Sequence, residues 1–85
     1  MDANPRRYIM NKKLSEFSIG ETGVIKTVFG EGRIRRRLFD MGVTPGAEVF
    51  MRKVAPLGDP IEVTIRGYEL TLRKTEAECV MLEVK

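Results

Sequence analysis

The chain has 85 residues, of which 42% are hydrophobic and 32% are charged, and its formal net charge is +3. This length is that of one small domain, and so mild a charge permits contact with an acidic partner without requiring one. The sequence contains no histidine and a single cysteine, Cys79. It therefore lacks the usual acid–base catalyst near neutral pH and the donors of a closed zinc site. The composition argues against an enzyme and against a prebuilt metal centre, and no cofactor is evident.

The beginning of the chain differs from the rest. Residues 1–13 are polar and lack the apolar stretch of a secretory signal, and no later run approaches the roughly 20 apolar residues that cross a bilayer. We therefore expect a cytoplasmic protein. Residues 1–11 are predicted to form a flexible N-terminal extension, followed by a single domain over 12–85. Leu14, Phe17 and Ile19 supply its first apolar anchors.

The clearest local pattern is an alternation of apolar and polar residues. It runs through 61–65 and again through 68–72, on either side of Gly67. Strict period-two alternation places one face of a strand in a core and the other in water. The two runs predict a β-hairpin in which Tyr68 packs on the buried side with the other apolar residues.

Further short strands are predicted from runs of β-branched and aromatic residues. These runs cover 24–29, 47–54 and 80–84, with turns at Pro45-Gly46 and at residues 57–60. About five strands in roughly sixty residues indicate an all-β fold, most simply a small barrel, because closure protects the strand edges.

Two helical segments interrupt the strands. The first covers 33–41, where apolar residues follow helical spacing and Gly42 provides a C-terminal stop. Its apolar stripe consists of Ile34, Leu38 and Met41. The second is a helical turn near 75–79, for which Thr75 and Glu78 form the pattern of a capping box.

Two segments are candidates for binding a partner, and each has two interpretations. The arginines of the predicted helix could form a basic patch for phosphate or an acidic protein, or simply a solvated helix face. The loop over 56–60 could be a recognition loop or an ordinary turn between strands. The candidate residues are Arg33, Arg36, Arg37, Pro56, Leu57, Gly58, Asp59 and Pro60.

Three segments together resemble the FeoA family. They are RLFDMGVTPG at 37–46, APLGDPI at 55–61 and RGYELTLRKTEA at 66–77. Their order and spacing extend the resemblance over residues 12–85. The resemblance implies an SH3-like β-barrel with the helix over 33–41 inserted between early strands. It also implies a cytoplasmic accessory of FeoB, the membrane transporter of ferrous iron that carries a GTP-binding domain.

The predicted function is therefore non-catalytic: the protein binds and modulates FeoB, is recruited through it to the inner face of the membrane, and does not insert there itself. Ferrous iron is the ion of this pathway, but no ligand set can be named from the sequence. Two alternatives stay open. One is a small basic barrel that binds nucleic acid, which the few aromatic residues disfavour. The other is a metal-responsive domain related to those that end DtxR-type repressors, using Cys79 or carboxylates across a dimer. The oligomeric state is not predicted.

Overall fold

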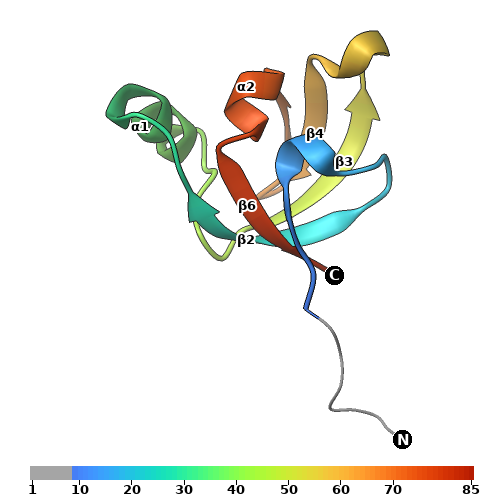
Figure 1. Ribbon diagram of the computed structural model, residues 1–85, viewed down its shortest axis with the longest axis horizontal. Helices are drawn as coiled ribbons and strands as arrows, with labels where there is room; N and C mark the ends of the chain where they lie inside the picture. The colour runs from blue at the N-terminus through green and yellow to red at the C-terminus, as the bar shows by residue number, and fades with distance from the viewer. Residues whose placement is uncertain (1–8) are drawn as a thin grey trace, which may run out of the picture.

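The structure is a computed structural model, and it describes residues 9–85. Its described part is a six-stranded antiparallel sheet in the order β1-β6-β2-β3-β4-β5 (Figure 1). The strands are β1 (Asn11–Lys13), β2 (Thr22–Val28), β3 (Glu48–Val54), β4 (Ile61–Ile65), β5 (Tyr68–Leu72) and β6 (Val80–Val84). The all-β prediction is confirmed, with one strand more than the five expected.

The additional strand, β1, begins at the last residue of the predicted extension. Asn11 pairs with Glu83 of β6, and the Val84 N–H donates to the Met10 carbonyl oxygen at 2.9 Å. Its sequence, Asn-Lys-Lys, has no apolar alternation, so only backbone pairing with β6 makes it a strand. The prediction for residues 1–8 lies outside the described residues.

Four helical segments lie between the strands. They are η1 (Leu14–Glu16), α1 (Gly32–Asp40), η2 (Pro56–Gly58) and α2 (Lys74–Ala77). Helix α1 confirms the helix expected over 33–41, and Leu38 is its fully buried residue. Gly42 follows it with a φ of +89°, in the left-handed region that favours glycine.

The start of α2 differs from the prediction. Thr75 and Glu78 were expected to form the capping box, but both are exposed. The Glu76 carboxylate instead accepts a hydrogen bond from the Arg73 N–H at 2.9 Å, because Arg73 is the residue before the helix and Glu76 stands three positions later. The helix therefore begins earlier than predicted.

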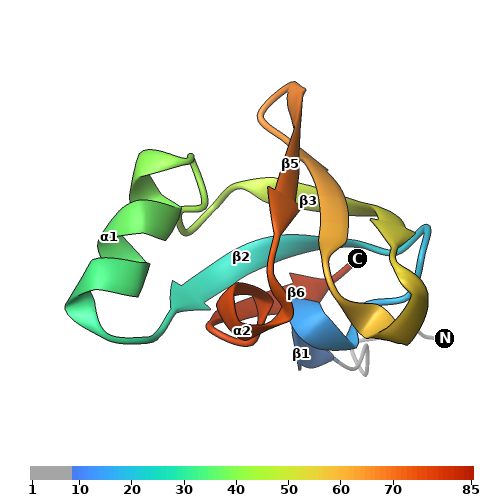
Figure 2. The same ribbon diagram turned by 90° about the horizontal axis from the view of Figure 1, so that it is seen from above.

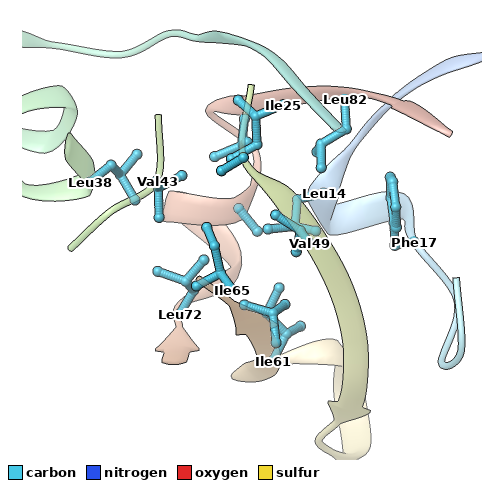
Figure 3. Close-up of a cluster of buried hydrophobic side chains, with 14 of the residues drawn as sticks. Leu14, Phe17, Ile25, Leu38, Val43, Val49, Ile61, Ile65, Leu72 and Leu82 are labelled. Atoms are coloured by element: carbon cyan, nitrogen blue, oxygen red, sulfur yellow. The ribbon is translucent and has the colours of Figure 1, made fainter. Parts of the chain in front are cut away.

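The core lies between the bent sheet and the short segments η1 and α2, whose Leu14 and Ala77 are buried. Figure 3 shows Leu14 from η1 beside Val49 of β3, while Leu38 from α1 lies next to Val43, and all four belong to the same core. The largest fully buried side chains include Leu14, Ile25, Leu38, Met51, Ile65, Leu72 and Leu82. Leu14 and Phe17 are anchors as predicted, but Ile19 is 64% exposed and does not belong to the core.

The predicted hairpin is present as β4 and β5. Arg66 and Gly67 join the strands with φ values of +48° and +85°, which is the backbone of a tight two-residue turn. Tyr68 does not pack in the core as expected. It is 43% exposed, because it sits at the tip of the hairpin, where its hydroxyl donates to the Met41 carbonyl oxygen. Arg66 also donates, through Nε, to the Gly42 carbonyl oxygen at 3.0 Å. The hairpin tip therefore holds the end of α1.

The helical segments gather at one end of the molecule. Helices α1 and α2 and the segment η2 lie at the top of Figure 1, and the two ends of the described chain lie toward the bottom. Figure 2, seen from above, places α2 between α1 and η2. Within residues 9–85, no helix is long and apolar enough to span a membrane.

Candidate partner-binding surface

A hollow of about 580 Å³ opens between α1, α2, the end of β5 and the loop before β4. Its lining residues are Arg37, Asp59, Pro60, Thr71, Arg73 and Glu76. The fold thus brings together one arginine of α1 and two residues of the 56–60 loop, which the sequence analysis identified separately. The side chains of this hollow and the loop over 56–60 are called the helical-end surface below.

The Glu76 carboxylate contacts two other residues that line the hollow. Glu76 is 7% exposed, and its two carboxylate oxygens have different partners. Oε1 accepts the Arg73 N–H, and Oε2 lies 3.5 Å from Arg37 Nε. The Arg37 side chain remains 61% exposed, so most of its guanidinium, which carries five N–H donors, faces solvent. The buried carboxylate therefore positions a solvent-accessible cation at the edge of the hollow.

The loop is held by hydrogen bonds to backbone groups at both ends. The Ala55 N–H donates to the Pro60 carbonyl oxygen at 3.0 Å, and the Gly58 N–H donates to the Ala55 carbonyl oxygen at 2.8 Å. The Asp59 carboxylate accepts the Lys74 N–H at 3.0 Å, which ties the loop to the first turn of α2. The loop is thus a defined structure next to the hollow.

Leu57 is the most exposed large apolar residue of this loop. Its side chain is 99% exposed, and its backbone has φ 75° and ψ 5°. This left-handed conformation costs an L residue with a Cβ about 1–2 kcal/mol. The candidate recognition loop therefore carries an apolar side chain that neither the core nor the backbone geometry explains.

A second, more apolar groove of about 410 Å³ lies on the other side of Pro60. Ile19, Val54, Ala55 and Ile61 contribute to its lining, and Pro60 and Thr71 line both this groove and the charged hollow. The loop therefore separates a charged surface from an apolar one.

The remaining arginines of α1 have different surroundings. Arg33 and Arg36 are exposed and do not line the hollow. Arg35 Nε donates to the Val28 carbonyl oxygen at 3.1 Å, and its guanidinium lies 4.7 Å from the centroid of the Phe39 ring. The basic cluster is therefore divided: Arg35 and Arg37 attach α1 to the rest of the domain, while Arg33 and Arg36 extend the positive charge outward.

Sequence reasoning missed Arg73 and Glu76 as residues of this surface. A signal was present, since Glu76 stands three residues after Arg73, which is the spacing of a capping box. It was assigned to the wrong pair of residues. Cys79, which one alternative offered as a metal ligand across a dimer, is intermediate in exposure. Among residues 9–85 no cluster of three or more His, Cys, Asp or Glu side chains is placed to hold a metal ion.

Comparison with known proteins identifies related sequences. The FeoA domain profile matches residues 12–84. A protein of Porphyromonas gingivalis (strain ATCC BAA-308 / W83), named as a fusion of Fe(2+) transport protein A and the Fe(2+) transporter FeoB, is 35% identical over 72 residues. This match covers 85% of the present chain but 8% of the fusion protein, so the chain corresponds to a small part of that polypeptide.

Solved structures of related proteins support the same family. An NMR structure of a FeoA-like protein from Clostridium acetobutylicum is 38% identical with a TM-score of 0.81, over 87% of this chain and 86% of that one. The crystal structure of Stenotrophomonas maltophilia FeoA complexed with zinc is 31% identical with a TM-score of 0.72, over 86% and 88%. That protein is described as a prokaryotic SH3 domain protein, and the predicted SH3-like fold is thereby confirmed. Sequence profile, relatives and fold lead to one conclusion: the chain belongs to the FeoA domain family, which is linked to ferrous iron transport.

Proposed function

We propose that this protein is a non-catalytic, cytoplasmic accessory of ferrous iron uptake that binds the cytoplasmic part of a FeoB transporter and modulates it. One observation carries the proposal. In the Porphyromonas gingivalis protein, a segment 35% identical to this chain belongs to the same polypeptide as FeoB. Fusion raises the effective concentration of two modules toward each other, which suits a domain whose role is to bind the transporter.

The helical-end surface supports this role. It combines the exposed guanidinium of Arg37, the side chain of Arg73 and the apolar side chain of Leu57. Arginines flanking an apolar centre are typical of protein interfaces, in which charges set orientation and association rate while apolar anchors supply affinity. The surface also lies opposite to the two ends of the described chain (Figure 1), so a covalent connection on that side leaves it accessible.

Modulation requires that the domain discriminate between states of the transporter. A bound module shifts a conformational equilibrium only by the ratio of its affinities for the two states. The mechanism we propose is therefore a difference in affinity of this surface for the nucleotide-bound and nucleotide-free forms of the GTP-binding domain, which alters the rate of GTP turnover without a catalytic group from this chain.

The proposal is tested by recording amide NMR spectra of the labelled protein while unlabelled GTP-binding domain of FeoB is added. Saturable shifts are expected at Arg37, Asp59, Thr71 and Arg73. Arg37→Gln should weaken binding about fivefold, as expected for the loss of one interfacial charge. Lys85→Gln is a matched control, because Lys85 is 57% exposed and is also paired with one carboxylate, Glu48, but lies near the C-terminal end.

The affinity for full-length FeoB in lipid nanodiscs is measured in parallel. Absence of binding both to the GTP-binding domain and to the full-length transporter would contradict the proposal. Shifts on addition of a short DNA duplex, in the absence of a response to FeoB, would favour a nucleic-acid-binding domain instead.

A further inference from the structure

Two independent observations distinguish Leu57 from the other exposed apolar residues. Its side chain is 99% exposed, so it adds nothing to the packing of the core. Its φ of 75° lies in the region that aliphatic side chains rarely adopt. An exposed leucine by itself needs no explanation, and a strained residue can be held by its own packing. Leu57 has no such packing, so folding does not account for a leucine here.

The backbone conformation of this turn favours a residue other than leucine at position 57. Pro56 and Leu57 are the central residues of a turn that is closed by the hydrogen bond from the Gly58 N–H to the Ala55 carbonyl oxygen, 2.8 Å. A positive φ at the third residue of such a turn favours glycine or asparagine. The sequence thus retains an apolar side chain at a position where a smaller or polar residue would stabilise the fold. Residues held in such conformations are enriched at binding sites.

We propose that Leu57 is an anchor residue that inserts into an apolar pocket on the cytoplasmic part of FeoB, and that carboxylates lie at the rim of that pocket. The inference rests on the function proposed above and specifies the chemistry of the partner. An apolar side chain that is completely exposed in the free protein gains the most from transfer into a pocket, because all of its surface is still in contact with water.

Charge complementarity supports the acidic rim. The hollow beside the loop presents Arg37, 61% exposed, whereas the Glu76 side chain beneath it is 9% exposed. The Asp59 carboxylate is also engaged, since it accepts the Lys74 N–H. The cations therefore face outward while these carboxylates have partners within the domain. A pocket that accepts Leu57 would meet Arg37 and Arg73 at its edge, where carboxylates give favourable pairs.

The loop is also organised before binding. Hydrogen bonds at Ala55, Gly58 and Asp59 fix its backbone, so little conformational freedom remains to be lost on association. The same loop contributes Asp59 and Pro60 to the hollow that Arg37 and Arg73 line. An exposed apolar side chain on a rigid loop next to such a charged hollow has the arrangement of an interface hot spot with a polar surround.

Asparagine at position 57 separates the anchor role from a structural one. It has nearly the size of leucine, tolerates positive φ, and lacks an apolar end. Leu57→Asn should weaken binding to full-length FeoB in nanodiscs about tenfold while the protein resists urea at least as well as the wild type. Leu57→Met, which keeps the apolar character, should bind within about threefold of the wild type. Ile9→Asn is the control, because Ile9 is 68% exposed and lies near the start of the described chain.

The possible results separate the two proposals. Equal binding of the wild type and Leu57→Asn would overturn the anchor and leave the proposed function standing. Failure of the wild type to bind FeoB would overturn both. A loss of binding accompanied by a loss of stability in Leu57→Asn would contradict the argument from strain. Analytical ultracentrifugation of the free protein tests self-association. If wild-type copies associate and Leu57→Asn abolishes this association, the partner of Leu57 is a second copy of the chain and not FeoB.

Discussion

Two leucines belong to two segments that border the charged hollow, α1 and the loop over 56–60, and their environments are opposite. Leu38, in α1, has an exposed fraction of 0%, and Leu57, in the loop before β4, has one of 99%. Both belong to segments that the sequence analysis considered for partner binding. The helix uses its leucine and two of its arginines to attach itself to the domain. The loop is attached through backbone hydrogen bonds and the Asp59 carboxylate, and its leucine is left in solvent.

This difference shows how a surface segment can be made available for binding. In α1 the side chains that could recognise a partner are partly occupied: Arg35 bonds to the Val28 carbonyl oxygen and Arg37 pairs with Glu76. In the loop, backbone hydrogen bonds and the Asp59 carboxylate provide the attachment, so the side chain of Leu57 is not needed to hold the loop. The loop is therefore the stronger candidate for an anchor, and α1 for a supplementary charge.

The largest expected effect tests the attachment of α1. Leu38→Ala removes a completely buried side chain and should lower the free energy of unfolding by about 3 kcal/mol, a large share of the stability of so small a domain. Leu57→Ala is the matched control, and it should change stability by less than about 0.5 kcal/mol. Urea denaturation followed by circular dichroism measures both. A loss below about 1 kcal/mol for Leu38→Ala would mean that α1 is not held by this residue.

A smaller effect tests the attachment of the loop. Asp59→Ala deprives the Lys74 N–H of its acceptor and should destabilise the domain by about 0.5–1 kcal/mol, in the range of helix-capping bonds. Asp59→Asn keeps a side-chain oxygen and should lose less. The same denaturation experiment applies, and hydrogen exchange at the Lys74 amide should accelerate in Asp59→Ala. An unchanged exchange rate would show that this bond does not fix the loop.

The smallest expected effect on stability concerns the ion pair of Lys12 and Glu21, which lies away from the hollow. This pair serves as a reference for the pair of Arg37 and Glu76. Lys12 Nζ lies 2.7 Å from Glu21 Oε1, and the pKa of Glu21 is lowered, first by the hydrogen bond from Lys12 and second by that from the Ser18 N–H. Because the pKa is lower in the folded state, this contribution to stability is present above the ordinary glutamate value of 4.5 and is lost as the pH falls through the folded value.

Lys12→Met should therefore raise the pKa of Glu21 toward the ordinary value and reduce the stability lost on acidification below pH 4.5. Carbon-detected NMR titration of the Glu21 carboxyl group measures the first effect, and urea denaturation at several pH values measures the second. Lys26→Met, which removes a partner of Glu83 at 3.2 Å, should leave Glu21 unaffected. An unchanged Glu21 titration in Lys12→Met would show that Lys12 is not the main cause.

Patterns that depend on neighbouring residues were predictable from the sequence. The hairpin of β4 and β5 follows from alternation around a turn, and α1 follows from an apolar stripe ending at a glycine, since both signals are local. The two segments that border the hollow were also identified, because clustered arginines and a loop with two prolines are visible in the sequence.

What could not be predicted depends on contacts between distant residues. Tyr68 has the alternation of a buried residue, but the hairpin tip extends past the core and its hydroxyl meets the end of α1. Strand β1 exists through its pairing with β6 alone. Glu76 joins α1 to α2, and no local pattern shows that Arg37 will lie beside it. The positive φ of Leu57 could not be predicted either, because that turn position favours glycine and the sequence has leucine there.

The pairing of β1 with β6 has a practical consequence. Asn11 stands opposite Glu83, so the chain enters and leaves the sheet at places separated by about 5 Å, the spacing of paired strands. A domain with such neighbouring ends can be inserted within a host polypeptide as readily as it can be appended to one, and it tolerates circular permutation. A fluorescent reporter at either end, or a short linker joining the two, should leave the opposite end of the molecule unobstructed.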